Sequence, residues 1–412
     1  MTDAYIIDAC RTPRGIGKIG KGALADLHPQ QLSATVLKAL AERNEIDTRE
    51  VDDVIWGTST QRGKQSMDTA RMSLLYAGYS HLASGVTLDR FCGSGITAVN
   101  MAAASIAAGF EDLVIAGGCE MMSYTASLAD PKNPSMMDAG NLGLRHKVPQ
   151  SHQGVCADAI ATLEHIPRRA LDELALVSQQ RADVAIKNGH FKRSLVPVLR
   201  EDGSVALDHE EFPRPQTTLE GLASLKASFG PVAEMPLDAE GNTYGGYIRQ
   251  VFPDLKIEHV HHAGNSSGVV DGAGGLLLAS PGYVKKRGLK PRARIVAMAN
   301  MGDNPTLMLN APVPATRKVL AKAGLTLDDI DLFEINEAFA VVAEKYIRDL
   351  KLNRDKVNVN GGAMALGHPI GATGSLLIGT LLDELERRDL KRGLGTMCAA
   401  GGMAPAIIIE RV

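Results

Sequence analysis

The sequence predicts an α/β protein with a duplicated core and an irregular insertion between its two halves. Three observations support this. Short apolar runs typical of strands alternate with helical segments, and the same order of elements occurs near both ends of the chain. The middle, from about residue 120 to 258, is instead rich in proline and charge. The 412 residues also exceed the size at which one core keeps growing, so two or three domains are expected.

The first half of the duplication begins almost at the N-terminus. Its expected elements are strand 5–9, helix 31–43, strand 51–56, strand 86–88, helix 95–108 and strand 112–116. The same order returns as strand 293–298, helix 315–323, strand 330–335, strand 357–360, helix 374–386 and strand 394–399. Strands that alternate with helices imply parallel sheets with helices on their faces. Two such halves would pack around a pseudo-twofold axis.

We expect four segments along the chain. They are an N-terminal half over 1–122, an inserted loop domain over 123–257, a return to the N-terminal half over 258–290, and a C-terminal half over 291–412. The insertion contains one amphipathic helix over 171–189, which ends at Gly189. Long irregular excursions from a rigid scaffold usually bind a ligand, with a structural cap or an oligomer contact as the equal alternative.

The composition narrows the class of protein. The formal net charge of −3 argues against a nucleic-acid partner. Five scattered cysteines form neither a disulfide framework nor a paired metal motif, so a reducing, cytoplasmic location is expected. The first strand leaves no room for a signal peptide. No uninterrupted apolar stretch is long enough to cross a bilayer, so no membrane span is expected.

Cys92 lies on a glycine-rich turn between strand 86–88 and helix 95–108. The unpaired N–H groups at the start of that helix favour a thiolate over a thiol. Gly93 and Gly95 let a reacting carbonyl approach closely. An isolated cysteine is more often a buried structural thiol. The second half of the chain reverses that preference.

Three loops of the second half carry reactive groups. Strand 330–335 ends in Asn336, strand 357–360 leads into a glycine-rich loop with His368, and the last strand delivers Cys398. The His368 loop falls where the Cys92 turn falls in the first half, so the symmetry brings the two together. A cysteine beside a histidine is the minimal activated nucleophile. A second thiol acting as acid and base, with an amide that holds a water, would complete a site for carbon-centred acyl transfer.

Four short motifs follow one another along the chain. They are Cys92-Gly93-Ser94-Gly95, Asn336-Glu337-Ala338-Phe339, Gly367-His368-Pro369-Ile370-Gly371-Ala372-Thr373-Gly374 and Cys398-Ala399-Ala400-Gly401-Gly402. In this order they resemble the thiolase family, and the likeness runs over residues 5–412. The resemblance implies a duplicated βαβαβ core with five-layer α-β-α-β-α packing and an inserted loop domain. It also implies an acyl-CoA C-acyltransferase that cleaves 3-ketoacyl-CoA with CoA to acetyl-CoA and a shortened acyl-CoA.

The resemblance implies a role for each reactive residue. Cys92 would attack the 3-carbonyl after His368 activates its thiol. His368 would also line one oxyanion hole, together with a water held by Asn336. Cys398 would protonate the departing acetyl-CoA carbanion and then take the proton of the incoming CoA thiol. The backbone N–H groups of Cys92 and Ala400 would form the second oxyanion hole.

Coenzyme A is expected as a substrate, with no tightly bound cofactor and no metal. Segment 264–273 resembles the family's segment next to coenzyme A, which implies contacts from Ser267 and Gly268. Arg214 and Lys226 of the middle could meet the CoA phosphates, against a stronger general preference for solvated charges. The resemblance also implies a homodimer or homotetramer, and a complex with a hydratase/dehydrogenase subunit is compatible with it. Residues 256–267 look most like the fatty-acid-oxidation thiolases that are β subunits of multifunctional complexes.

Four positions depart from the family pattern. Ala400 and Ala404 stand where glycine is usual. The backbone donor at Ala400 survives the added methyl group only if φ is negative. Val269-Val270 replaces the commoner Leu-Asn, which changes the side chains next to the pantetheine contacts implied there. Chain length or turnover can therefore differ from the usual enzyme.

Three further motifs point to other functions and are disfavoured. Residues 15–22 nearly match a phosphate-binding P-loop, but Gly22 replaces the metal-binding hydroxyl. Residues 264–268 fit a hydrolase elbow around Ser266, but the glycines that follow make a poor helix start. Alternation on a strand would put His259 and His261 on one face and His262 on the other. Two ligands on a face are too few for zinc, so structural histidines are expected.

The rival functions differ in what they require. An acetoacetyl-CoA-forming biosynthetic thiolase would use the same residues in the reverse direction. A ketoacyl synthase is disfavoured because Asn336 stands where its second histidine would be. A non-catalytic acyl-CoA-binding scaffold subunit would need neither Cys92 nor Cys398.

Overall fold

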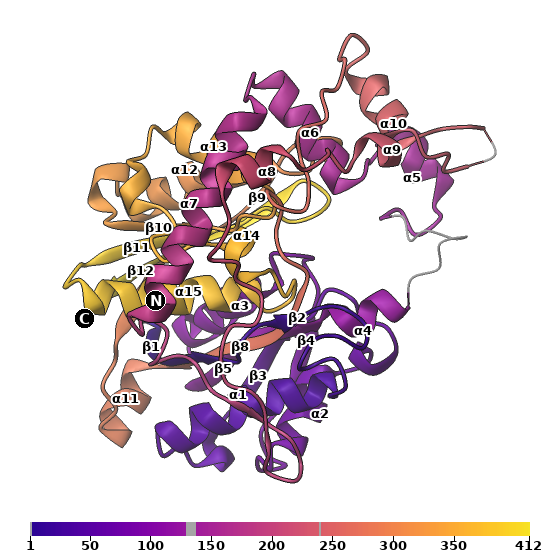
Figure 1. The fold of residues 1–412 in the computed structure, drawn as a ribbon. Coiled ribbons are helices and arrows are strands. Elements are labelled where there is room, and N and C mark those ends of the chain that lie inside the picture. Colours follow the sequence, from indigo (N-terminus) through magenta and orange to yellow (C-terminus); the bar gives the residue numbers. More distant parts are fainter. Residues whose placement is uncertain (1, 129–136, 239) are drawn as a thin grey trace.

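One mixed sheet forms the core of the computed structural model, which describes residues 2–128, 137–238 and 240–412 (Figure 1). The order of its ten strands is β10-β11-β12-β9-β1-β8-β5-β3-β4, with β2 paired to β8. The strands are β1 (Tyr5–Arg11), β2 (Gly15–Ile16), β3 (Asp53–Gly57), β4 (Val86–Leu88), β5 (Leu113–Met121), β8 (Val270–Ala279), β9 (Ala293–Gly302), β10 (Leu332–Ile335), β11 (Arg392–Thr396) and β12 (Met403–Arg411). β1 meets β9 over two residue pairs, which join an N-terminal and a C-terminal half-sheet.

The two half-sheets repeat one topology, which confirms the predicted duplication. In the first, β3 and β5 are parallel, while β5 with β8 and β8 with β1 are antiparallel. In the second, β10 and β11 are parallel, while β11 with β12 and β12 with β9 are antiparallel. The counterpart of the parallel strand β4 is a single bridge between Phe333 and Val357. The predicted strand 357–360 is therefore wrong in extent.

Two central strands, β8 and β12, were not expected from the sequence, and they make the sheet mixed rather than parallel. Gly274 and Gly275 weaken the strand signal of β8, and Pro405 weakens that of β12. Close packing explains why glycine stands at position 275. A Cβ on Gly275 would lie only 3.1 Å from the ring of Trp56, so a side chain there would have to displace the ring.

Five layers result, as the resemblance implies (Figure 1). Helices α3 (Ser94–Ala108) and α15 (Thr373–Arg387) form the central layer, where one apolar cluster joins them to strands of both halves. α1 (Pro29–Arg43), α2 (Thr69–Tyr76) and α11 (Pro281–Arg287) pack with the N-terminal outer core. α12 (Pro312–Ala323) and α13 (Ala340–Leu350) pack with the C-terminal outer core.

The two central helices touch at their N-terminal ends because glycines stand there. A Cβ on Gly95 would lie 2.8 Å from the backbone nitrogen of Ser375, and a Cβ on Gly374 would lie 2.0 Å from that of Ile96. Only residues without a side chain permit such an approach. The turns that lead into these helices carry Cys92 and His368, so this contact places both turns at the same point of the fold.

Replacing Gly374 with alanine should destabilise the protein by at least about 1–3 kcal/mol, because the methyl group meets backbone that cannot move aside. Gly379 of the same helix is the matched control. Its added Cβ would lie 3.4 Å from the Cβ of Ala9, and alanine improves helix propensity by about 1 kcal/mol. Denaturant unfolding of both variants tests this, and equal stabilities would contradict the glycine contact.

Residues 91–108 have the length and apolar composition of a membrane-spanning helix, so the expectation that no such stretch exists is wrong on that criterion. Of that window, 61% is buried inside the protein. A core helix between two sheets is apolar on all sides for the same reason as a membrane helix. The central position of α3 accounts for its composition.

The insertion packs mainly on the C-terminal half (Figure 1). Its elements are α4 (Met122–Ser127), α5 (Leu142–Lys147), α6 (Gln153–Leu163), α7 (Arg168–Lys187), β6 (Val198–Leu199), β7 (Val205–Leu207), α8 (Leu219–Ala223), α9 (Gly230–Ala233) and α10 (Tyr244–Val251). α7 confirms the predicted amphipathic helix, and it lies beside α13 and the short helix α14 (Ala363–Leu366). On the apolar side of its sequence pattern, Leu171 and Ala182 are buried, whereas Ile186 is exposed.

The three neighbouring histidines tie the return segment to the insertion. The Nδ1 atoms of His259 and His261 each lie 2.7 Å from a carboxylate oxygen of Asp158 on α6. His262 Nε2 lies 2.9 Å from Asp172 on α7. These pairs support the structural role expected for the histidines. Among the described residues, no group of three or more ligating side chains has the arrangement of a metal site.

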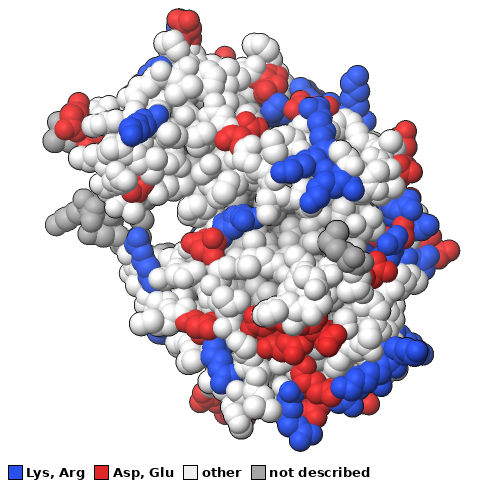
Figure 2. Space-filling view, turned by 180° about the vertical axis from the view of Figure 1, so that it is seen from behind, with Lys and Arg blue, Asp and Glu red and all other residues white. Residues whose placement is uncertain are grey.

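The surface carries charges of both signs. On the face seen in Figure 2, basic and acidic side chains are interspersed, with local groups of each sign. This distribution agrees with the small net charge of −3.

Candidate active site

Cys92 is held on a tight turn between β4 and α3. The preceding residue, Phe91, has a left-handed φ of +49°, and its N–H donates to Asp89 Oδ1 at 2.6 Å. Ser94 closes the turn, because its hydroxyl accepts from the Arg90 N–H and donates to the Phe91 carbonyl. A residue strained in this way persists where its surroundings over-determine it, often at a functional site.

A cavity of about 240 Å³ opens onto the half-buried Cys92. It lies between the catalytic loops and the insertion. Its lining residues are Ser59, Phe91, Cys92, Met137, Gln150, Ser151, His152, Gln153, Tyr244, Met308, Ile370 and Ala400. The cavity therefore gives a small molecule access to the Cys92 thiol and to the loop after β11.

His368 is buried, and its hydrogen bonds define its tautomer. Its Nδ1 lies 2.6 Å from the hydroxyl of Thr373, which donates its own proton to the carbonyl of Pro369. Nδ1 must therefore carry the proton, and Nε2 keeps a free lone pair. Burial lowers the pKa of His368 to about 4, so the imidazole is neutral at physiological pH. Nε2 is available to accept a proton.

Asn336 lies at the end of β10, beside that nitrogen. Its side-chain Nδ2 is 3.4 Å from Nε2 of His368, and its Oδ1 is buried without a hydrogen-bond partner among the described residues. A buried acceptor without a partner is costly. The side chains of Asn336 and His368 together thus offer unsatisfied hydrogen-bonding atoms, which suit a small polar ligand.

Cys398 and Ala400 come from the loop between β11 and β12. The Ala399 N–H donates to the Met403 carbonyl at 2.7 Å, and Gly401 and Gly402 both have a φ of +77°. These glycines take the left-handed conformations, and Ala400 is not among the described residues with positive φ. Ala400 therefore avoids the strained positive φ, and its backbone N–H remains usable as a donor.

The Cys92 sulfur lies within reach of two backbone donors. The N–H groups of Cys92 and Ala400 both lower the pKa of this thiol, although burial and then the charge of Glu120 raise it to about 12. Burial also raises the pKa of Cys398, and the neighbouring Cys92 sulfur raises it further. The two sulfurs and the two donors consequently share one site.

Burial outweighs the favourable end of α3 and raises the pKa of Cys92, which favours a neutral thiol over the thiolate expected from the sequence, while burial keeps the His368 imidazole neutral. Between about pH 5 and 9, the difference in thiolate absorbance between the wild type and a Cys92→Ser variant should stay flat. An absorbance step near pH 6 would show a thiolate–imidazolium pair instead.

Glu120 holds the two halves together at this point, and sequence reasoning missed it. It is fully buried at the end of β5. Its carboxylate accepts from the N–H groups of Ser59, Thr60 and Gly371 at 2.9–3.1 Å and from Gln65 Nε2 at 2.7 Å. Gly371 belongs to the His368 loop, so Glu120 fixes that loop to the N-terminal half. A charged residue inside an apolar strand was the available signal.

Ser267 and Gly268 lie directly beside the His368 loop. Ser267 donates its N–H to the Ala338 carbonyl, and the His368 N–H donates to the Gly268 carbonyl at 2.9 Å. The ring of Phe212 covers Gly268 so closely that an added Cβ would lie 2.3 Å from it. The hydrolase elbow is absent, because β8 rather than a helix follows Ser266.

Arg214 and Lys226 are placed differently. The Arg214 guanidinium lies 5.7 Å from the centre of the Phe212 ring, which puts an exposed cation near Gly268. Lys226 is exposed in the loop after α8. Neither side chain lines the Cys92 cavity. The structure thus connects Arg214, through Phe212, to the segment next to His368.

Comparisons with known proteins agree along the whole chain. Residues 4–233 match the thiolase N-terminal domain and residues 289–411 the thiolase C-terminal domain. A steroid 3-ketoacyl-CoA thiolase of Mycobacterium tuberculosis is 39% identical over all of this chain and 95% of that protein. A 3-oxoadipyl-CoA/3-oxo-5,6-dehydrosuberyl-CoA thiolase of Escherichia coli is 41% identical over all of both. The crystal structure of the Bacillus anthracis acetyl-CoA acetyltransferase superposes with a TM-score of 0.83 at 34% identity, covering 100% of this chain and 99% of that one.

Proposed function

The chain belongs to the thiolase family of acyl-CoA C-acyltransferases, and we propose that Cys92, His368 and Cys398 carry its thiolytic cleavage of 3-ketoacyl-CoA. One observation carries the assignment. The Cys92 turn of the first half meets the His368 loop, through Ile370, and the Cys398 loop, through Ala400, at one accessible cavity, with two backbone donors beside the sulfur. No carrier or scaffold requires two thiols and a neutral histidine in such an arrangement.

The first half-reaction forms an acyl-enzyme. Nε2 of His368 takes the Cys92 proton as sulfur attacks the 3-carbonyl, whose oxygen becomes an oxyanion held by the N–H groups of Cys92 and Ala400. The bond between C2 and C3 then breaks, and its electron pair leaves as the enolate of acetyl-CoA. The protonated His368 and a water held by Asn336 stabilise the enolate oxygen. The Cys398 thiol protonates C2.

The second half-reaction releases the shortened product. Cys398, now a thiolate, takes the proton of the CoA thiol. CoA sulfur attacks the Cys92 thioester, the same two N–H groups hold the oxyanion, and the Cys92 sulfur leaves with the proton from His368. Both cysteines and His368 return to their starting states. The neutral resting pair fits this cycle, because each proton moves only when a substrate is present.

We place the enzyme in degradation rather than synthesis. Residues 256–267 resemble the fatty-acid-oxidation type, and the names of the M. tuberculosis and E. coli relatives describe thiolases of 3-ketoacyl-type substrates. Likeness to the B. anthracis acetyl-CoA acetyltransferase supports the biosynthetic alternative. Thiolysis rates across 3-ketoacyl-CoAs of increasing chain length test this, since preference for acetoacetyl-CoA alone would support the biosynthetic role.

The remaining assignments concern ligands and partners. We propose that Ser267 and Gly268 contact the pantetheine of CoA, and that Arg214, near them, meets its phosphates. Lys226 is proposed for the phosphates on its exposure alone. From the family resemblance we propose a homodimer or homotetramer, with which a complex with a hydratase/dehydrogenase subunit is compatible. The proposed cytoplasmic location is supported by the scattered cysteines.

A further inference from the structure

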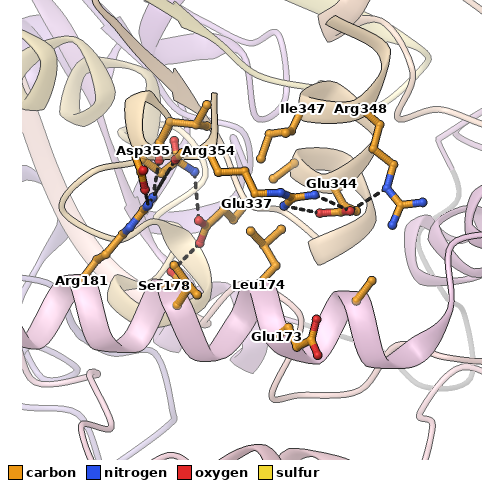
Figure 3. Close-up of a pocket in the computed structure, with 15 residues that line it drawn as sticks. Glu173, Leu174, Ser178, Arg181, Glu337, Glu344, Ile347, Arg348, Arg354 and Asp355 are labelled. Carbon is orange, nitrogen blue, oxygen red and sulfur yellow. Dashed lines mark hydrogen bonds and ion pairs between the residues drawn. The ribbon is translucent and has the colours of Figure 1, made fainter. Parts of the chain in front are cut away.

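A second cavity, of about 430 Å³, lies between α7 of the insertion and α13 of the C-terminal half (Figure 3). It opens on a different part of the molecule from the Cys92 cavity and shares no lining residue with it. Ser178, Glu337 and Asn358 lie together in its lining. Glu337 directly follows Asn336 in the chain, so the back of the catalytic loop faces this cavity.

Glu337 is buried, and three donors hold its carboxylate. Ser178 Oγ of α7 donates at 2.7 Å (Figure 3). Asn358 Nδ2 donates at 2.9 Å and the Met364 N–H at 3.2 Å. Gly362 makes room for it, because a Cβ there would lie 2.2 Å from the carboxylate carbon. The carboxylate therefore has one position, and the peptide between Asn336 and Glu337 is fixed from behind.

Asn358 fixes the peptide on the other side of Asn336. Its side-chain amide accepts from the Ile335 N–H and donates to the Ile335 carbonyl, both at 2.9 Å. It pairs with the last residue of β10 as a neighbouring strand would, where the predicted strand 357–360 is missing. Its backbone has a left-handed φ of +46°, which asparagine tolerates better than most residues. The Asn358 side chain thus makes the two hydrogen bonds to β10 that a neighbouring strand would otherwise make.

We propose that Glu337 and Asn358 are positioning residues for Asn336, and that the hydrogen bond from Ser178 holds them to the insertion. Within the described residues, the Asn336 side chain has a hydrogen bond to His368 at 3.4 Å, and its Oδ1 has no hydrogen-bond partner. The direction of the Asn336 side chain is therefore set by the backbone. Asn358 holds that backbone at the residue before Asn336, and Glu337 holds it at the residue after. This inference rests on the proposed role of Asn336 at the enolate oxygen.

The arrangement makes a selective prediction. Asn336 serves only the step that breaks the carbon–carbon bond, whereas exchange of an acetyl group between acetyl-CoA and labelled CoA forms no enolate. A displacement of about 1 Å can cost about 10²-fold in rate. A Glu337→Ala variant should therefore lose about 10²-fold in thiolysis and stay within about threefold of wild type in exchange. Glu337→Gln, which keeps an acceptor, should recover much of the thiolysis.

Glu344 provides the matched control. It is an equally buried carboxylate of the same cavity, but it binds Arg348 and Arg354 instead of the catalytic loop. Glu344→Gln should leave the ratio of thiolysis to exchange unchanged. Asn358→Gly, which keeps the left-handed backbone and removes the amide, should lower that ratio as Glu337→Ala does. Retained exchange shows that each variant has folded.

Three outcomes would overturn the inference. Equal loss of both rates in Glu337→Ala and Asn358→Gly would indicate general damage, and unchanged rates would show that the network is dispensable. A ratio lowered equally in Glu344→Gln would show that the effect is not specific to the catalytic loop. An Asn336→Ala variant separates the hypotheses. If it lowers both rates equally, the proposed role of Asn336 fails; if it lowers thiolysis alone while the other variants do not, only the positioning role fails.

Discussion

Replacing Cys92 with alanine should abolish the acyl-enzyme and lower thiolysis by about 10⁴-fold or more, as expected when the nucleophile of a covalent mechanism is removed. The cavity, the two backbone donors and His368 would all remain, but no atom could take the acyl group. Intact-mass measurement after incubation with acetyl-CoA should show an acetyl adduct on the wild type and none on the variant.

Cys10→Ala is the matched control for this variant. Cys10 is a buried thiol in the N-terminal outer core, bonded to the Val36 carbonyl and remote from the Cys92 cavity. Its loss should leave acylation intact. An acetyl adduct that survives in Cys92→Ala would move the nucleophile to another residue and contradict the proposed mechanism.

The meeting of the Cys92 turn with the His368 loop was predictable because it follows from the duplication. Both residues precede the equivalent helices α3 and α15, and glycines in both helices permit the contact. The order of strands and helices, which reveals the duplication, can be read from local sequence patterns. The resting charge of Cys92 was not predictable in the same way. A helix N-terminus contributes at most about 2 kcal/mol, whereas a pKa raised from 9.0 to about 12 corresponds to about 4 kcal/mol.

The supporting residues were missed because their partners are distant in sequence. Glu120 binds Gly371, and Glu337 binds Ser178 of the insertion. No local pattern reveals which backbone donors a buried carboxylate will satisfy. Asn358 was assigned to a strand because its neighbours are apolar and β-branched, but its left-handed backbone lets a side-chain amide take the place of that strand. The tautomer of His368 depends likewise on Thr373 and its bond to Pro369.

Replacing Cys398 with alanine should leave slow acylation of Cys92 while lowering thiolysis and acetyl exchange by about 10²–10⁴-fold, the usual contribution of a general acid–base group. The thiol is buried next to Cys92, and burial, with a further contribution from Cys92, raises its pKa, so it holds a proton until an enolate forms beside it. Without it, C2 of the departing enolate has no acid and the incoming CoA has no base. Mass spectrometry should therefore show a trapped acetyl-enzyme that turns over slowly.

Cys156→Ala serves as the control, because Cys156 is an equally buried thiol that bonds the Thr306 carbonyl and does not line the Cys92 cavity. It should acylate and turn over as the wild type does. The contrast between the two cysteine variants separates loss of an acid–base group from loss of a buried sulfur. Full turnover by Cys398→Ala would require that another group, such as His368, carries both protons, and the assignment of two thiols to two different tasks would then be wrong.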